Sequence, residues 1–111
     1  MIDLIRDNLD SIHELCERFN VRKLEVFGSA ADGRYREGES DVDFIVEFEP
    51  GLSVGIARVY FDFLHALEQL LHRPVDLLIL REEYGINPYF LREIAKSREV
   101  IHATSGEEVP A

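Results

Sequence analysis

The chain has 111 residues, enough for one compact domain, and its formal net charge of −10 argues against direct binding to a nucleic-acid backbone. Its one cysteine, Cys16, excludes an internal disulfide and a metal site built from paired cysteines. No apolar run is long enough to cross a bilayer, and Asp3 and Asp7 interrupt the apolar N-terminus, so we expect no signal peptide, no membrane association and a cytoplasmic location.

Residues 2–19 are predicted to form one amphipathic helix. Its apolar residues recur at steps of three and four: Ile5, Leu9, Ile12, Cys16 and Phe19. This stripe places Cys16 in the core, where it acts as a small hydrophobic residue rather than a reactive thiol. The apolar segment 24–27, which Glu25 interrupts and Gly28 ends, predicts a short strand.

The middle of the chain predicts a loop, a strand and a second long helix. Residues 30–40 are polar and include two glycines, which is typical of a loop. Segment 41–48 alternates apolar and polar side chains, so it is predicted to be a half-buried strand. After a turn at Pro50 and Gly51, Ser53 is the predicted N-cap of the helix. The predicted core stripe of that helix is Ile56, Tyr60, Phe63, Leu67 and Leu70 or Leu71.

The last third predicts a buried strand and a final helix. Segment 75–80 is apolar apart from Asp76, which is typical of a buried strand. Asn87 and Pro88 predict the start of a helix that reaches residue 101. The domain then covers residues 1–103, and residues 104–111 form a flexible acidic tail. This order of elements predicts an α/β (α+β) domain with a small mixed β-sheet flanked by helices.

The pair Gly28-Ser29 stands where the first predicted strand ends. A glycine lets a phosphate approach the backbone closely, and free N–H groups and a hydroxyl at such a turn suit an anion. Taken alone, a Gly-Ser pair after a strand most often marks only a turn.

Three aspartates are candidate metal ligands. Asp41 and Asp43 are two residues apart on a strand, so their carboxylates project from one face and can share a divalent cation. The alternative is the polar outer face of a half-exposed strand. Asp76 requires a cation or hydrogen-bond donors if it is buried, whereas at the start of its strand it would face solvent beside Pro74.

Together, the Gly28-Ser29 pair, the Asp41–Asp43 pair and the Asp76 strand resemble the DNA polymerase β-like nucleotidyltransferase superfamily, in particular its smallest branch, the minimal nucleotidyltransferases (MNT). The resemblance implies the fold of that superfamily. It also implies that Gly28 and Ser29 bind the triphosphate of ATP, that Asp41 and Asp43 hold two Mg²⁺ ions, and that Asp76 is the third catalytic, metal-binding carboxylate, facing the attacking hydroxyl. A two-metal site of this kind stabilises the attacking and leaving oxygens together.

The chain departs from the superfamily pattern in two places. The spacer of residues 30–40 is one residue longer than is common, and Asp32 stands where many members have an arginine. The second change removes a phosphate contact that Arg34 or Arg36 can replace. Neither change touches the three carboxylates.

The four histidines share no metal-ligand spacing with one another. We expect them to be surface or groove residues: His13, His65, His72 and His102.

A separate domain to hold the acceptor is absent from the sequence, so we expect the acceptor to be a partner or to be bound by one. Minimal nucleotidyltransferases are typically encoded beside a HEPN-domain RNase toxin and act as its antitoxin by adding AMP to a toxin tyrosine. The resemblance therefore implies an Mg²⁺-dependent adenylyltransferase antitoxin, active as a homo- or hetero-oligomer. A docking surface is predicted at Tyr84, Tyr89 and Phe90; the alternative is that all three side chains pack into the core. Two alternatives remain: a module that neutralises its partner by contact alone, and nucleotidyl transfer to a small molecule.

Overall fold

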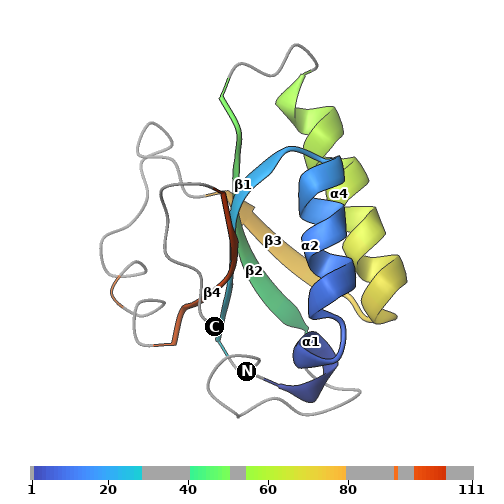
Figure 1. The fold of residues 1–111 in the computed structure, drawn as a ribbon, viewed down its shortest axis with the longest axis vertical. Coiled ribbons are helices and arrows are strands. Elements are labelled where there is room, and N and C mark those ends of the chain that lie inside the picture. Colours follow the sequence, from blue (N-terminus) through green and yellow to red (C-terminus); the bar gives the residue numbers. More distant parts are fainter. Residues whose placement is uncertain (1, 29–40, 51–54, 80–91, 93–96, 105–111) are drawn as a thin grey trace.

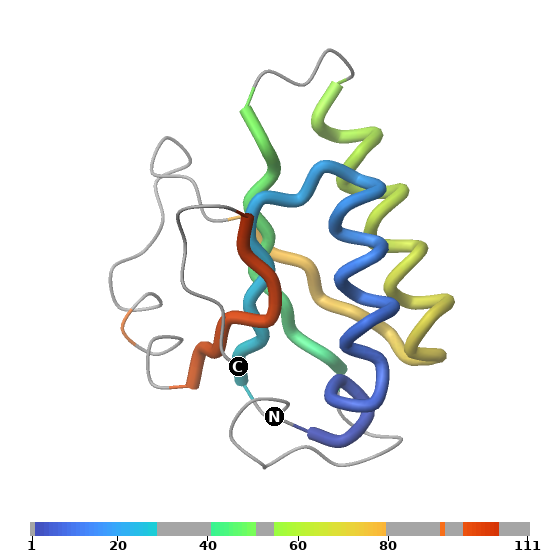
Figure 2. Tube along the Cα trace, in the orientation of Figure 1, coloured from blue at the N-terminus to red at the C-terminus, as the bar shows by residue number. Residues whose placement is uncertain are grey.

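The computed structural model describes residues 2–28, 41–50, 55–79, 92 and 97–104. These residues form a four-stranded sheet with helices packed on one of its faces (Figure 1). Figure 2 shows the chain of α2 and α4 running side by side along that face. The prediction of a mixed α/β domain with a small sheet is confirmed.

The N-terminal segment forms two helices, α1 (Asp3–Arg6) and α2 (Leu9–Arg18), so the prediction of one helix over residues 2–19 is wrong. The break lies at Asn8, whose side chain donates a 2.7 Å hydrogen bond to the Leu4 carbonyl. An asparagine side chain that bonds the backbone competes with the regular helical pattern. The apolar face continues across the break, because Ile5, Ile12 and Cys16 are all fully buried.

The sheet consists of β1 (Val21–Phe27), β2 (Val42–Phe48), β3 (Val75–Ile79) and β4 (Glu99–Ala103), in the order β3-β2-β1-β4. β1 is antiparallel to both β2 and β4, whereas β2 and β3 are parallel. β1 begins earlier than the predicted residue 24. β2 and β3 lie where their sequence patterns predict them.

β4 corrects the predicted course of the last helix, because residues 99–103 are a strand. Val100 and Ile101 are β-branched, a type that is enriched in strands. Val100 lies opposite Glu25 on the edge of β1 that β2 leaves unpaired, and Ile101 lies at the point where the β1–β4 register shifts. The start of the predicted helix, at Asn87 and Pro88, lies outside the described residues.

Helix α4 (Ile56–Leu71) follows the predicted stripe, with Phe63, Leu67 and Leu71 buried. Its N-cap is Gly55 and not the predicted Ser53. Tyr60 lies partly buried beside the same core.

Two side chains of α4 bond to the backbone of β3. The Tyr60 hydroxyl donates a 2.6 Å hydrogen bond to the Leu77 carbonyl, and the Glu68 carboxylate accepts the Val75 N–H at 3.1 Å. Among the strands in the described part of the chain, β3 lies at the edge of the sheet, so these side chains satisfy backbone groups that another chain could otherwise pair with. The two bonds flank Asp76 and hold its strand against α4.

The core lies between the helices and the sheet. Its side chains come from both layers: Ile5, Ile12, Cys16, Val21, Leu24, Val26, Val42, Phe44, Val46, Phe63, Leu67, Leu71, Val75, Leu77 and Ile101. Cys16 is fully buried, which confirms that it is a core residue, and burial raises the pKa of its thiol to about 12, as expected of an unreactive cysteine. None of the helices in the described part of the chain is long and apolar enough to cross a membrane.

His13 and His102 do not match the expectation of scattered surface residues. Their Nδ1 atoms lie 3.0 Å apart between α2 and β4, and His102 is 8% exposed. His65 and His72 are exposed as expected. His13 and His102 lie near opposite ends of the chain, so only the packing of α2 against β4 brings them together.

Candidate active site

The structure brings two of the three predicted carboxylates together. In the parallel β2–β3 pair, Asp43 lies directly opposite Asp76. The neighbours of each aspartate, such as Val42 and Val75, face the helices, so both carboxylates project from the other face of the sheet. Asp76 is exposed, which resolves the alternatives for this residue: it faces solvent, and it also faces Asp43.

The electrostatics of Asp43 reflect this crowding. Its pKa is raised to about 6, first by burial, then by a hydrogen bond with the Asp76 carboxyl group and by the negative charges of Asp76 and Asp41. Carboxylates that share a site resist simultaneous ionisation, and a bound cation relieves that cost. The raised pKa therefore marks a place where positive charge is favourable.

Asp41 stands apart from this pair. It precedes β2 and is exposed, although its charge reaches Asp43. Within residues 2–28, 41–50, 55–79, 92 and 97–104, no three His, Cys, Asp or Glu side chains lie close enough together to hold a metal ion. Mg²⁺ is commonly bound by one or two carboxylates together with substrate phosphates and water, so the Asp43–Asp76 pair fits this ion.

Gly28 closes the site on the side of β1. The preceding residue, Phe27, pairs with Asp43, and Gly28 itself has a φ of 70°. A Cβ atom added to Gly28 would lie 2.8 Å from Oδ2 of Asp43. Both its conformation and this close approach therefore require glycine.

The backbone of Gly28 does not offer the free N–H group that we expected. This N–H donates a 3.0 Å hydrogen bond to Oγ of Ser97. Gly28 thus serves the site by leaving space, and a phosphate would have to bind to other groups. Its neighbour Ser29 lies outside the described residues.

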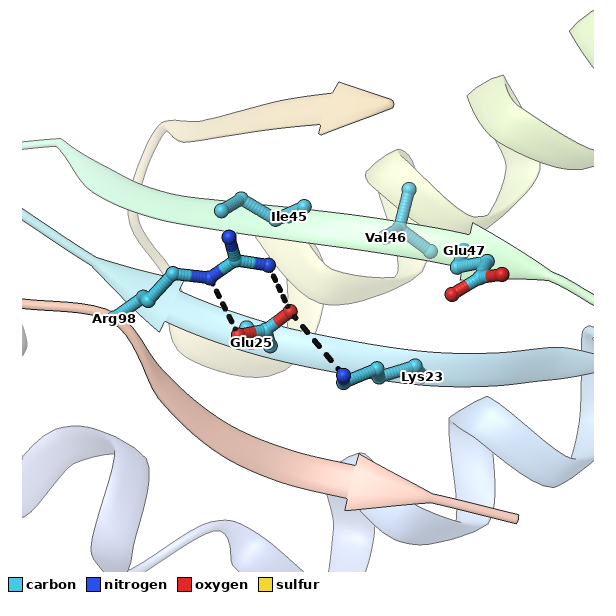
Figure 3. Close-up of a pocket in the computed structure, with 6 residues that line it drawn as sticks. All are labelled: Lys23, Glu25, Ile45, Val46, Glu47 and Arg98. Carbon is cyan, nitrogen blue, oxygen red and sulfur yellow. Dashed lines mark hydrogen bonds and ion pairs between the residues drawn. The ribbon is translucent and has the colours of Figure 1, made fainter. Parts of the chain in front are cut away.

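A charged cluster lies on the same outer face, between β1 and the start of β4. Arg98 donates two hydrogen bonds to the Glu25 carboxylate, at 2.8 and 2.6 Å, and Lys23 lies 3.9 Å from it (Figure 3). These side chains line a hollow of about 110 Å³ together with residues of β2. Glu25 is 5% exposed, so the carboxylate is buried against its partners.

The sequence patterns do not predict this cluster. The signal was Glu25, a single acidic residue within the apolar segment 24–27. A carboxylate that is buried in a strand needs a cationic partner. The sequence does not reveal which of the twelve lysines and arginines supplies it.

Several predicted site residues lie outside the described part of the chain. They are Asp32, which stands where many family members have an arginine, the phosphate-contact candidates Arg34 and Arg36, and the predicted docking residues Tyr84, Tyr89 and Phe90. We expected the four histidines to share no metal site, and the contact between His13 and His102 does not test that prediction.

The comparisons with known proteins agree with this fold. The family model of the nucleotidyltransferase domain matches residues 11–101. The protein adenylyltransferase MntA of Thermococcus cleftensis is 39% identical over 82 residues, which cover 73% of this chain and 79% of that protein. A solved structure described as a minimal nucleotidyltransferase has a TM-score of 0.67 and 31% identity, covering 87% of this chain and 94% of the other.

A more distant structure shares the fold alone. It is a chain from the complex of the tri-AMPylated HEPN toxin of Shewanella oneidensis with an MNT antitoxin. The TM-score is 0.57 and the identity 20%, with 89% of this chain and 72% of the other covered. The family match spans most of the chain and includes the strands that carry Asp43 and Asp76. The chain therefore belongs to the nucleotidyltransferase domain family, and within it to the minimal nucleotidyltransferases.

Proposed function

We propose that this nucleotidyltransferase is an Mg²⁺-dependent adenylyltransferase that transfers AMP from ATP to a tyrosine of a HEPN-type RNase toxin and thereby acts as its antitoxin. The observation that carries the chemistry is the Asp43–Asp76 carboxylate pair beside the Gly28 turn. The relative from Thermococcus cleftensis is named a protein adenylyltransferase, which supports a protein as the acceptor.

The proposal assigns each predicted residue a role. Asp41, Asp43 and Asp76 are the metal-binding and catalytic carboxylates. The Gly28-Ser29 turn is the binding site for the triphosphate, to which Gly28 contributes the space beside Asp43 rather than its N–H group. The two Mg²⁺ ions, when bound, neutralise the phosphates and stabilise the charge that develops during transfer. Asp41 is exposed immediately before β2, and its negative charge acts on Asp43.

In the proposed reaction the tyrosine oxygen attacks the α-phosphorus of ATP. A new O–P bond forms, the bond between the α-phosphorus and the α–β bridging oxygen breaks, and pyrophosphate leaves. The phenolic proton goes to Asp76, the more exposed member of the carboxylate pair, which can therefore reach an acceptor bound from solvent. Asp43 is partly buried and hydrogen-bonded to Asp76, so its proposed role is to bind the cation rather than to exchange protons with the acceptor.

The direct test combines the protein with its HEPN toxin, ATP and Mg²⁺ and follows the toxin by mass spectrometry. We expect a mass increase of one or more AMP units on a toxin tyrosine. Asp43→Asn should abolish the increase. Asp62→Asn, which changes an exposed carboxylate on α4, is the matched control and should leave transfer intact.

The same experiment decides between the alternatives. A toxin that is inhibited but carries no AMP indicates a module that neutralises by contact. A toxin that is neither modified nor inhibited, with AMP found on a small molecule instead, indicates a small-molecule nucleotidyltransferase. The placement of Asp43 directly opposite Asp76 supports transfer, because neutralisation by contact alone has no use for two adjacent carboxylates, one of which has a raised pKa.

A further inference from the structure

The turn at Gly28 is tied to the start of β4. Val26 lies opposite Glu99 in the antiparallel β1–β4 pair. The same register, continued by two residues, places Gly28 opposite Ser97. At this point the positive φ of Gly28 ends the regular strand. The Gly28 N–H donates a hydrogen bond to the Ser97 hydroxyl oxygen instead of to a backbone carbonyl. The Ser97 side chain thus takes the place of a backbone hydrogen-bond partner at the end of β1.

The position of this turn sets the space above Asp43. An added Cβ on Gly28 would lie 2.8 Å from Oδ2 of Asp43, so the backbone passes directly beside the carboxylate. A small shift of the Gly28 backbone toward Asp43 would close the space for a cation and a phosphate, and a shift away from Asp43 would widen that space. Groups that are misplaced by about 1 Å can cost a large factor in rate or affinity.

Ser97 is itself held by its neighbour in sequence. Arg98 donates two hydrogen bonds to the Glu25 carboxylate, at 2.8 and 2.6 Å, and the Glu25 side chain is almost fully buried (Figure 3). A bidentate, charge-assisted pair of this kind is stronger and more directional than a single neutral hydrogen bond. It joins β1 to the residue that follows Ser97, close to the point where Ser97 meets Gly28.

We propose that Ser97 is a positioning residue that fixes the Gly28 turn beside the carboxylate pair, and that the Glu25–Arg98 ion pair holds Ser97 in place. Ser97 touches neither nucleotide nor acceptor in this role. The inference rests on the proposed function only in taking the Gly28 turn as part of the ATP site.

The test compares Ser97→Ala with Ser97→Thr, which keeps the hydroxyl, and with Ser11→Ala, an exposed serine on α2, as the control. We measure the Kd of Mg-ATP by calorimetry without toxin, and kcat and KM for AMP transfer with toxin. Loss of one hydrogen bond that orders the site should weaken Mg-ATP binding about tenfold and raise KM similarly, with kcat nearly unchanged. Ser97→Thr should restore most of the affinity, and thermal melts confirm that each variant is folded.

The role of the ion pair is tested by Arg98→Lys, which keeps the charge but loses the two-pronged geometry. It should weaken Mg-ATP binding in the same direction. Because both residues act through the same contact, the double variant Ser97→Ala/Arg98→Lys should be hardly weaker than Ser97→Ala alone. Fully additive losses would show that Arg98 acts independently of Ser97 and would overturn that half of the proposal.

The outcomes separate this inference from the proposed function. Equal Mg-ATP affinity of Ser97→Ala and wild type overturns the inference, whatever the toxin assay shows. A toxin that wild type leaves unmodified contradicts the proposed function, while the calorimetry still decides the role of Ser97. If wild type binds no nucleotide, exchange of the Gly28 amide proton followed by NMR decides: faster exchange in Ser97→Ala supports the inference, and unchanged exchange overturns it.

Discussion

At the scale of single residues, Asp43 shows a conflict between stability and activity. Its pKa is raised from 3.8 to about 6 in the folded protein, so between these values the folded state binds more protons than the unfolded state. The stability contribution of the protonated group is fully present below pH 3.8 and is lost as the pH rises through about 6. At neutral pH the ionised Asp43 therefore destabilises the protein in the absence of cations.

This predicts that Asp43→Asn stabilises the protein while it abolishes nucleotidyl transfer. We expect a gain of about 1 kcal/mol at pH 8, reduced by partial solvent exposure. The gain should disappear near pH 4, where the native carboxyl group is neutral too. Urea denaturation at both pH values measures it. A variant that is less stable than wild type at pH 8 would contradict the assigned repulsion between Asp43 and its neighbours.

The variant Asp76→Asn is predicted to separate nucleotide binding from transfer. If Asp76 receives the proton of the attacking hydroxyl, Asp76→Asn should lower Mg-ATP affinity modestly and nearly stop transfer, the pattern of an interaction made mainly in the transition state. The competing role, a polar residue that merely faces solvent at the start of β3, predicts that asparagine serves as well. Calorimetry and timed AMP transfer distinguish the two, and near-normal transfer would remove Asp76 from the catalytic residues.

At the scale of elements, β4 is held against α2 by the His13–His102 contact. Burial, and secondarily the charge of His13, lower the pKa of His102 below its usual 6.5, while Glu17 opposes this. A histidine with a depressed pKa contributes stability that is complete above pH 6.5 and is lost as the pH falls below that value, because the unfolded state then binds more protons. The docking of β4 should therefore weaken in mild acid.

We predict that the free energy of unfolding falls between pH 7 and pH 5 and that His102→Phe removes part of this dependence. The measurement belongs in the Asp43→Asn background, because Asp43 responds to pH in the opposite direction over an overlapping range. His65→Phe, on the exposed side of α4, is the matched control. An identical pH dependence with and without His102 would show that the pair does not couple β4 to pH.

At the scale of the whole molecule, the net charge is −10 and Asp43 lies opposite Asp76, so a bound cation with its nucleotide should stabilise the fold. Mg²⁺ with ATP at a hundred times its dissociation constant should raise the free energy of unfolding by about 2.7 kcal/mol. Thermal melts with ATP, with Mg²⁺ and with both measure this. The variant Asp43→Asn should not show this increase. A wild-type protein whose thermal melt is unchanged by Mg-ATP would contradict the proposed enzymatic function.

The sequence by itself determined the features that depend on local periodicity. Alternation along a strand places Asp43 on the face opposite Val42 and Phe44, and a repeat of three and four places Phe63, Leu67 and Leu71 in the core. Gly28 was likewise identified by its place at the end of a strand. The motif set was enough to name the family, because its three parts occur in order along the chain.

Only the tertiary structure decided which distant residues meet. The register of the parallel β2–β3 pair sets Asp43 opposite Asp76, and β4 becomes a strand because β1 offers an edge to pair with. The same edge brings Ser97 to Gly28. No local pattern encodes such contacts, since their free energy comes from partners far along the chain, and this tertiary contribution overrides the helical tendency predicted for residues 99–101.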